Sequence, residues 1–331
     1  IDYLRYDVLS EKEIFGKLSR FEFPEEEQRI YAADQRINDY GILADLDLAH
    51  AAQDMDEEYK ARLTEKAEKE FGLSSLKSMP QLKGFIKERT GVVIESLNKN
   101  SIEEEIKTIA SLKNVTEEDT QAVLDVIDLR REIGKTSNAK YTAILASAGR
   151  GNRIRGLFRY YGANRTGRWA GRLVQLQNLP QNHIEDLDGA RDLAKLHDLD
   201  LMEVIYDKPT HILSQLIRTA FIAPEGYTFS VADFSAIEAR VIAWVANEQW
   251  RLDLFNDPKA DIYCASASKM FGVPVHKGDD LRQRGKVAEL ALGYGGGVNA
   301  LTTMDIKKAL KDEEKPQILS KWREANKKVV S

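Results

Sequence analysis

The segment that most constrains this chain is a stretch in which four side chains recur at every fourth position. Arg282, Lys286, Leu290 and Tyr294 follow one another at this spacing. On an α-helix, steps of four keep side chains on one slowly drifting stripe. Two fixed cations suit a polyphosphate, and an aromatic ring beyond them suits a nucleobase. The pattern predicts a helix that faces a nucleotide, although a solvated amphipathic helix with a basic face would show the same spacing.

The distribution of charge predicts a local surface for nucleic acid. The chain has 331 residues, is 43% hydrophobic and 31% charged, and has a formal net charge of −5. Its length indicates roughly two or three domains, and its net charge argues against a general polyanion-binding protein. Residues 135–182, however, contain no Asp or Glu, and basic residues there alternate with aromatic ones, as in a phosphate-binding surface. These basic residues are Lys135, Lys140, Arg150, Arg153, Arg155, Arg159, Arg165, Arg168 and Arg172.

Cysteine usage and hydropathy indicate a reducing, aqueous compartment. Cys264 is the only cysteine, which rules out an internal disulfide and favours the cytoplasm. There is no apolar run of about eighteen residues, so no membrane span is expected. The chain starts at Ile1 with neither an initiating Met nor a signal-peptide layout, and we expect it to begin inside a longer protein.

Apolar periodicity predicts helices along most of the chain, and hence a predominantly helical α+β protein. Thr116 is expected to begin one of these helices as its N-cap. Residues 227–233, rich in β-branched and aromatic side chains, are expected to form a buried strand. The expected helical ranges are 1–20, 25–56 with a break at 39–41, 58–135 with loops at 72–75 and 91, 186–207, 209–220, 235–245, and 251–331 with loops near 258 and 272–280.

The predicted strand ends on Asp233, which makes this carboxylate a candidate metal ligand. Mg²⁺ is typically held by one or two carboxylates together with substrate phosphates. Ser235 and Glu238 have the spacing of a capping box, so these two residues could simply begin a helix. Capping does not account for the Asp two residues earlier.

Three segments together resemble the family A (polymerase I-like) DNA polymerases. The run from Asp233 to Arg240, DFSAIEAR, is similar to motif A of that family. The stripe that starts at Arg282 is similar to the family's fingers-helix motif, and Thr166-Gly-Arg168 followed by Gln177-Asn178 is similar to its primer-template signature. The resemblance implies a right-hand architecture of thumb, palm and fingers with an antiparallel palm sheet. It also implies template-directed DNA synthesis, in which dNTPs are added to a primer 3′-OH and pyrophosphate is released.

The resemblance also implies a role for each matching residue. Asp233 and the Phe234 carbonyl would bind Mg²⁺, with two ions expected and Mn²⁺ as a substitute. Glu238 would exclude a ribose 2′-OH, and Lys286 would help pyrophosphate to leave. The expected nucleotide-binding residues are Arg282, Lys286, Glu238, Leu290, Tyr294 and Tyr263, and the expected DNA-binding residues are Arg168, Gln177, Asn178, Tyr294 and Gly295.

The sequence departs from the family pattern at several points. Leu290 stands where the family usually has Phe or Tyr, and Tyr263 replaces the His of an Asp-Ile-His motif. No His-Asp pair follows Lys286, so the second metal-binding carboxylate expected of the family is absent from the sequence. Tyr3 and Asp7 match the last motif of a proofreading exonuclease, whose partner carboxylates would precede Ile1.

The expected organisation follows the order of these motifs. Residues 1–20 would be the remnant of an exonuclease-like domain, 21–145 the thumb, 146–248 the N-terminal part of the palm and 249–331 the fingers. The expected partners are primer-template DNA and dNTPs, bound by a monomer in the host cytoplasm of a phage-encoded enzyme. The alternative is a non-catalytic primer-template binding fragment or accessory protein. A single-subunit RNA polymerase is disfavoured by Glu238.

Overall fold

The computed structural model describes residues 2–94, 106, 109, 115–305 and 309–331. The chain divides into two compact units, residues 1–229 and 230–331. The first combines helices with a small antiparallel sheet, and the described part of the second contains helices and loops. The predicted α+β, predominantly helical class is confirmed. The functional division at residues 20, 145 and 248 stays a prediction.

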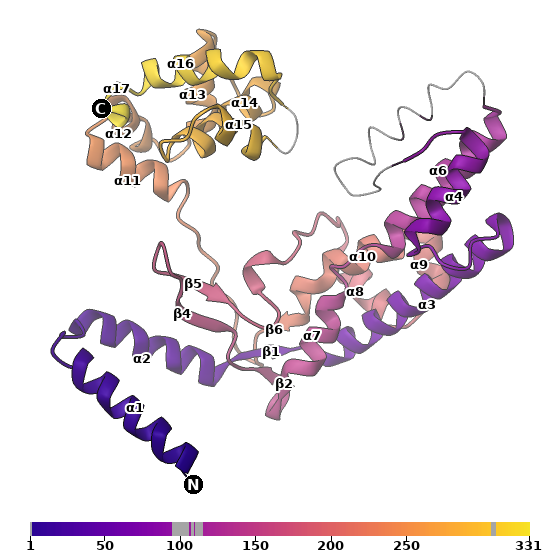
Figure 1. Cartoon of the computed structure of the whole chain (residues 1–331), viewed down its shortest axis with the longest axis horizontal. Coiled ribbons are helices and arrows are strands. Elements are labelled where there is room, and N and C mark those ends of the chain that lie inside the picture. Colours follow the sequence, from indigo (N-terminus) through magenta and orange to yellow (C-terminus); the bar gives the residue numbers. More distant parts are fainter. Residues whose placement is uncertain (1, 95–105, 107–108, 110–114, 306–308) are drawn as a thin grey trace. The chain divides into compact units, whose positions relative to one another are not determined.

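The first unit places its helices before and after short strands (Figure 1). Its helices are α1 (Asp2–Leu18), α2 (Glu25–Tyr40), α3 (Leu46–Phe71), α4 (Met79–Thr90), α6 (Glu117–Ile133), α7 (Ala139–Ser147), η1 (Arg150–Asn152), η2 (Leu176–Asn178), α8 (Leu187–Lys195), α9 (Leu199–Tyr206), α10 (Pro209–Leu216) and η3 (Ile217–Ala220). Its strands are β1 (Ile42–Ala44), β2 (Ala148–Gly149), β3 (Arg153–Ile154), β4 (Phe158–Ala163), β5 (Arg168–Gly171) and β6 (Phe221–Ile222).

The larger sheet has the order β2-β3-β1-β6, and every pair in it is antiparallel. Its centre is β1, in which Leu43 is paired with Arg153 on one side and Ile222 on the other. The sequence predicted a helix here, and for residues 42–44 this prediction is wrong. The reason is tertiary: Gly41 ends α2, and pairing on both edges then fixes the next three residues as strand.

Local sequence signals set the helix ends in this unit. Gly41 ends α2 at φ +66°, and an added Cβ would lie 2.4 Å from the Ile154 carbonyl oxygen, so only glycine fits. Asp45 caps α3 by accepting a hydrogen bond from the Leu48 backbone N–H. Thr116 caps α6 by accepting from the Asp119 backbone N–H at 3.0 Å, which confirms the predicted start.

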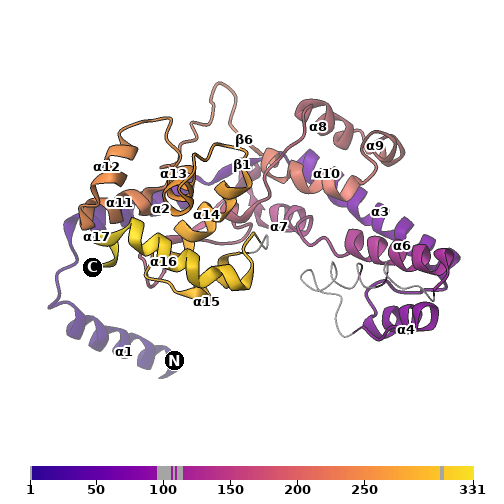
Figure 2. The ribbon, with the colours of Figure 1, turned by 90° about the horizontal axis from the view of Figure 1, so that it is seen from above.

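A continuous apolar core runs along α3 and joins it to α6, α7, α8 and α10. Leu48, Met55 and Tyr59 are among the α3 side chains buried in it. The helices α4 and α6 contact each other at the end of α3 that is distant from the sheet (Figure 2). Within the described part of the range 58–135, the expected helical structure and the breaks at Gly72 and Gly91 are confirmed.

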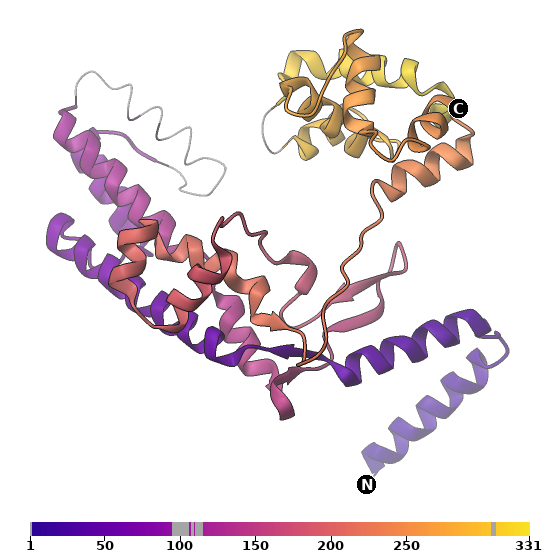
Figure 3. The ribbon, with the colours of Figure 1, turned by 180° about the vertical axis from the view of Figure 1, so that it is seen from behind.

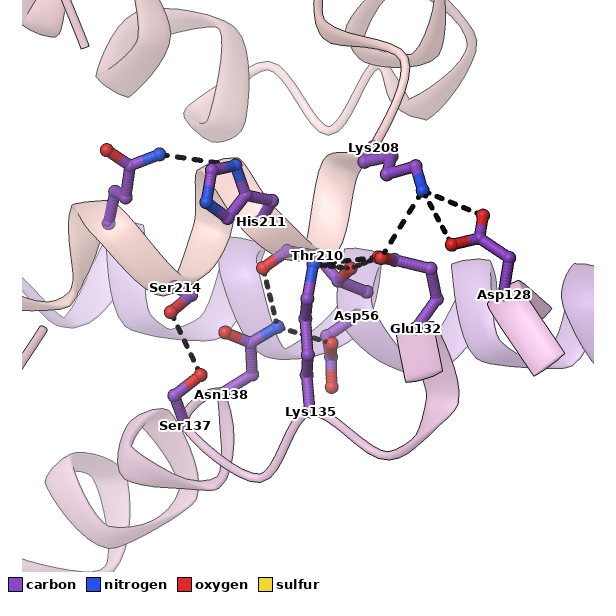
Figure 4. A network of polar contacts seen from close by, with 11 residues as sticks. Asp56, Asp128, Glu132, Lys135, Ser137, Asn138, Lys208, Thr210, His211 and Ser214 are labelled. Carbon is purple, nitrogen blue, oxygen red and sulfur yellow. Dashed lines mark hydrogen bonds and ion pairs between the residues drawn. The ribbon is translucent and has the colours of Figure 1, made fainter. Parts of the chain in front are cut away.

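A buried polar network fixes how α3, α6 and α10 meet (Figure 4). Asn138 donates to Asp56 at 2.6 Å and to the Thr210 carbonyl at 3.3 Å. Glu132 accepts hydrogen bonds from Lys135 and from the Thr210 hydroxyl. Because buried polar groups are costly when unpaired, this network favours one arrangement of the three helices.

The second unit is built from short helices (Figure 1). They are α11 (Ile237–Ala246), α12 (Gln249–Phe255), α13 (Ile262–Phe271), α14 (Asp280–Leu292), α15 (Val298–Met304), η4 (Asp312–Glu314), α16 (Lys315–Ala325) and α17 (Lys327–Val330). The core lies where α13, α14, α15 and α16 meet, around Met270, Val287, Leu301 and Trp322. For the described residues, the helices predicted at 235–245 and within 251–331 are confirmed, but the chain is also non-helical at 293–297, 305 and 309–311. No described helix is long and apolar enough to cross a membrane.

Around Asp233, the predicted strand is wrong, and the alternative of a capping box at Ser235 is excluded. Residues 227–233 are not a buried strand: they form an irregular segment in which Val231 is 92% exposed. A strand needs a neighbour for its backbone hydrogen bonds, and this segment pairs with no described strand. Ser235 does not cap the next helix, because α11 begins after Ala236, which has φ +51°, and no side chain caps that end.

Candidate nucleotide and nucleic-acid sites

The predicted nucleotide-facing stripe lies on α14, which packs closely against α13. The close approach depends on Gly285, where an added Cβ would lie 2.2 Å from the Tyr263 carbonyl oxygen and 3.0 Å from the Ala267 Cβ. Arg282 and Lys286 lie on either side of this glycine in sequence, and neither is fully buried. The glycine therefore brings both cations close to the N-terminal turn of α13.

Tyr263 joins the two cations into one cluster. The Arg282 guanidinium lies 5.4 Å, and the Lys286 ammonium 6.0 Å, from the centre of the Tyr263 ring. Burial raises the pKa of the Tyr263 hydroxyl, and the Asp261 carboxylate raises it further. The hydroxyl therefore stays protonated near neutral pH and can donate a hydrogen bond. The Glu238 carboxylate raises the same pKa to a smaller extent.

Asp261 orients Arg282. One carboxylate oxygen accepts hydrogen bonds from the backbone N–H groups of Tyr263 and Cys264, and so caps α13. The other oxygen accepts a hydrogen bond from Arg282 Nε at 2.9 Å and forms an ion pair with an Nη at the same distance. Burial would raise the pKa of Asp261, but the hydrogen bond from Arg282 and the cap outweigh it and lower the pKa. Asp261 is therefore ionised near neutral pH and holds the guanidinium in place.

The end of the stripe differs from the expected helix. Leu290 lies on α14 with 40% of its surface exposed. Tyr294, however, lies beyond the helix, one residue after the Gly293 C-cap, and is 69% exposed. Gly295 follows it at φ +77°, a left-handed conformation that favours glycine. The expectation of four helical positions is thus correct for three of them.

The candidate metal ligands are exposed. Asp233 and Phe234 precede α11, and Phe234 is 80% exposed. No group of three or more His, Cys, Asp or Glu side chains that could hold a metal is present among the residues the structure describes. Asp233 as a metal ligand stays a prediction, and Glu238 lies in the first turn of the following helix.

A buried ion pair beneath α14 was not predicted from the sequence. Arg251, 1% exposed, donates two hydrogen bonds to the Glu289 carboxylate at 2.8 and 2.9 Å and a third to the Asn326 side chain at 2.6 Å. Trp322 donates to the same carboxylate at 2.8 Å. The network joins α14 to α12 and α16, and Glu289 is three residues beyond Lys286. It therefore fixes the position of the helix that carries the two cations.

In the first unit, the predicted primer-template residues lie along β5 and the turn that follows it. Arg168 begins β5, Gly171 ends it, and Gln177 and Asn178 lie in η2, exposed like Arg168. An added Cβ at Gly171 would lie 2.1 Å from the Gln177 Oε1. Gln177 therefore rests directly on the end of the strand that Arg168 begins. Three residues of extended chain span on the order of 10 Å, so Arg168 and the Gln177 side chain lie at opposite ends of one short strand.

The hairpin of β4 and β5 is attached to α2 (Figure 3). Trp169 donates from its indole nitrogen to the buried Asp34 at 2.8 Å, and Tyr160 packs edge-to-face on Trp169 and Tyr31. Asn38 completes the attachment by exchanging hydrogen bonds with the backbone of Phe158. The aromatic side chains within the basic run therefore hold the hairpin to α2.

Six arginines of the basic run, between residues 153 and 172, differ in their surroundings. Arg153 and Arg155 donate to backbone carbonyls near the end of α2, including those of Gly41 and Asp39, so their role is structural. The exposed arginines on and beside the hairpin are Arg159, Arg165, Arg168 and Arg172. Fewer residues are therefore candidates for the predicted phosphate-binding surface than the sequence alone suggested.

Tyr3 and Asp7 lie four residues apart on α1, and both are exposed. Steps of four place them on one face of the helix, and their match to the exonuclease motif stays a prediction.

Comparisons with known proteins identify the family. A sequence profile of DNA polymerase family A matches residues 47–329. The chain belongs to DNA polymerase family A. It is 50% identical to a DNA polymerase of Bacillus phage SP02 over 332 aligned residues, which cover 99% of this chain and 50% of the phage protein. It is also 37% identical to the thermostable DNA polymerase I of Thermus aquaticus over 91 residues, 27% of this chain and 11% of that protein.

A solved structure shows the same fold. The POL domain of Pol1 from M. smegmatis, in complex with a DNA primer-template and dNTP, matches 88% of this chain and 45% of that chain with a TM-score of 0.57 and 21% identity. The predicted family A polymerase architecture is confirmed at the level of the fold. The chain spans about half the length of the phage polymerase that it matches.

Proposed function

We propose that this chain takes part in template-directed DNA synthesis, in which a primer 3′-OH attacks the α-phosphate of a dNTP and pyrophosphate leaves. The observation that carries the proposal is the cluster of Arg282, Lys286 and Tyr263 on two packed helices of a family A polymerase chain. The solved M. smegmatis relative binds a primer-template and a dNTP, which supports the same two ligands here. Residues 1–20 would be an exonuclease remnant, 21–145 the thumb, 146–248 the palm and 249–331 the fingers.

In this proposal the cations bind and orient the triphosphate. Phosphoryl transfer depends mainly on positioning and on stabilising the charge that develops on the phosphates. Arg282, already oriented by Asp261, would hold the phosphates farthest from the reacting atom, and Lys286 would lie one turn nearer to it. Tyr263 would donate a hydrogen bond in place of the family's histidine. Tyr294 and Gly295 would lie near the templating base, and Leu290 near the sugar.

Asp233 is the carboxylate that this chain would contribute to a site for two Mg²⁺ ions. One carboxylate, a backbone carbonyl and triphosphate oxygens are the ligands that Mg²⁺ prefers, and Asp233 with the Phe234 carbonyl would provide the protein's share. Bound metal ions neutralise charge on the transferred phosphate and favour the nucleophile.

The primer-template contacts predict a specific effect of Gly171→Ala. The added methyl group overlaps the end of the Gln177 side chain, which is flexible and can move away, so the fold should stay intact. We expect primer-template affinity to fall about three- to tenfold, the size of one lost hydrogen bond to DNA. Fluorescence anisotropy with a labelled duplex measures this affinity.

A double-mutant cycle tests whether Gly171 acts through Gln177. Gln177→Ala alone should weaken binding by a similar factor, and Gly171→Ala should add little to it. Gly84→Ala is a matched control, because a Cβ there meets nothing within 4 Å. Fully additive effects of the two substitutions would show that Gly171 acts independently of Gln177.

The choice of sugar tests the proposed function. On a DNA primer-template with Mg²⁺, we expect the chain to add dNTPs in preference to rNTPs. Glu238→Ala should raise rNTP incorporation relative to dNTP by roughly 10- to 200-fold, because a side chain that excludes one small group contributes on the order of 1–3 kcal/mol. DNA binding without addition of either nucleotide would favour the alternative, a non-catalytic primer-template binding protein.

A further inference from the structure

A small cationic cavity lies beside the nucleotide-binding cluster in the second unit. It has a volume of about 240 Å³ and is lined by the start of α11, the loop before α13, the loop before α14 and Arg282. Pockets for drug-sized ligands are larger, roughly 300–1,000 Å³. The size therefore suits a compact ligand. Lys286 and Asp233, the residues proposed to lie nearest the reacting phosphate, do not line it.

The charges of the residues that line the cavity indicate which class of ligand it would bind. Four cationic side chains, Arg240, Lys259, Lys277 and Arg282, face one carboxylate, Asp261. Such a surplus of positive charge in a small cavity attracts a compact polyanion. Little of the cavity surface is apolar. Each aromatic ring in the lining already has a cation beside it: Arg282 lies 5.4 Å from the centre of the Tyr263 ring, and Arg240 lies 4.5 Å from that of Phe255.

Two of the four cations are already held by the protein. Arg240 stacks on Phe255 at 4.5 Å and donates to the backbone carbonyls of Ser235 and Phe255. Arg282 is paired with Asp261. These interactions fix the positions of the Arg240 and Arg282 guanidinium groups. An anion that enters the cavity therefore meets two positive charges that are already oriented.

The other two cations, Lys259 and Lys277, are available. Both are exposed, and neither ammonium has a hydrogen bond or ion pair among the residues described. Each lies in a turn that an aspartate stabilises: Asp257 accepts from the Lys259 backbone N–H at 2.9 Å, and Asp279 from the His276 backbone N–H at 2.7 Å. The turns hold both lysines at the cavity while their ammonium groups remain without a partner.

We propose that this cavity binds the pyrophosphate released by nucleotide addition, with Lys259 and Lys277 as its specific ligands. The proposal rests on the proposed function, since that reaction supplies the pyrophosphate. Arg282 is the residue shared by the cavity and the triphosphate cluster, and it lies at the end of the stripe farthest from Tyr294. The β- and γ-phosphates that Arg282 would bind before the reaction are the same groups that leave afterwards. The cavity would hold them as they separate from the α-phosphate.

The test measures pyrophosphate binding directly, apart from DNA synthesis. Isothermal titration calorimetry of magnesium pyrophosphate into the chain should show that affinity falls at least about tenfold in the double variant Lys259→Ala/Lys277→Ala, since two charge-assisted contacts are lost. The control Lys327→Ala/Lys328→Ala removes two exposed positive charges from α17 in the same unit and should bind like the wild type. Far-ultraviolet circular dichroism checks that every variant is folded.

Two outcomes would overturn the proposal. Equal pyrophosphate affinity in the double variant and the wild type would show that the lysines are not ligands. An equal fold-loss of affinity for pyrophosphate and for dNTP would place them in the triphosphate site instead of a product site. If the chain binds pyrophosphate through these lysines but adds no nucleotide, the proposed function is wrong, whereas the cavity is still an anion-binding site.

Discussion

Replacing Asp233 with alanine is expected to lower the rate of nucleotide addition by roughly 10³-fold or more. In the proposed reaction this carboxylate is the metal ligand that the chain supplies next to the primer terminus. Losing a metal that stabilises transition-state charge costs several kcal/mol, and each 1.4 kcal/mol or so is a factor of about ten in rate. Single-turnover primer extension in Mg²⁺ measures the effect, with primer-template affinity measured in parallel.

The same substitution should leave the fold intact. Asp233 is exposed and lies outside helices and strands, and such positions usually change stability by less than about 0.5 kcal/mol. Primer-template affinity should therefore stay close to that of the wild type. Glu313→Ala is a matched control, because it removes an exposed carboxylate from the same unit without approaching the motif. If Asp233→Ala extends the primer as fast as the wild type, Asp233 takes no part in the reaction.

Replacing Arg251 with alanine is expected to destabilise the second unit by about 3–5 kcal/mol, the usual cost of leaving one member of a buried ion pair without its partner. The Glu289 carboxylate would remain buried after losing both hydrogen bonds from Arg251. Of the side chains that donate to it in the wild type, only the Trp322 indole would be left. Urea unfolding followed by tryptophan fluorescence reports mainly on this unit, since Trp244, Trp250 and Trp322 lie in it and only Trp169 lies in the other.

Two further variants separate charge from packing at this site. Arg323→Ala removes an exposed arginine from the neighbouring α16 and should change stability by less than about 0.5 kcal/mol. The double variant Arg251→Met/Glu289→Leu removes both charges and should regain most of the loss, because apolar replacements of buried pairs are often neutral or stabilising. If Arg251→Ala unfolds at the same urea concentration as Arg323→Ala, the ion pair does not stabilise the unit.

The sequence predicted the parts of the site that depend on short-range spacing. Steps of four residues placed Arg282 and Lys286 on one helix, and local capping chemistry identified Thr116 as a helix start. The same reasoning failed for residues 227–233, because a strand forms only against a partner that local composition does not reveal. It also placed Tyr294 on the helix, whereas Gly293 ends the helix one residue earlier.

What sequence reasoning missed are contacts between residues distant along the chain. Glu289 stands among Val287, Ala288, Ala291 and Leu292 on α14, and a charge within such an apolar face does indicate a buried partner. Nothing local identifies that partner as Arg251, 38 residues earlier. Likewise, Lys259 and Lys277 belong to separate loops, and only the packing of α13 against α14 brings them to one cavity.

The most direct test of the central claim is whether the template dictates what the chain adds. Four primer-templates that differ only in the templating base are each incubated with the protein, Mg²⁺ and all four dNTPs, and the first added nucleotide is identified by mass spectrometry. The account predicts that the added nucleotide changes with the templating base in all four cases. Addition that ignores the templating base, or no addition by protein that binds both DNA and dNTP, would contradict it.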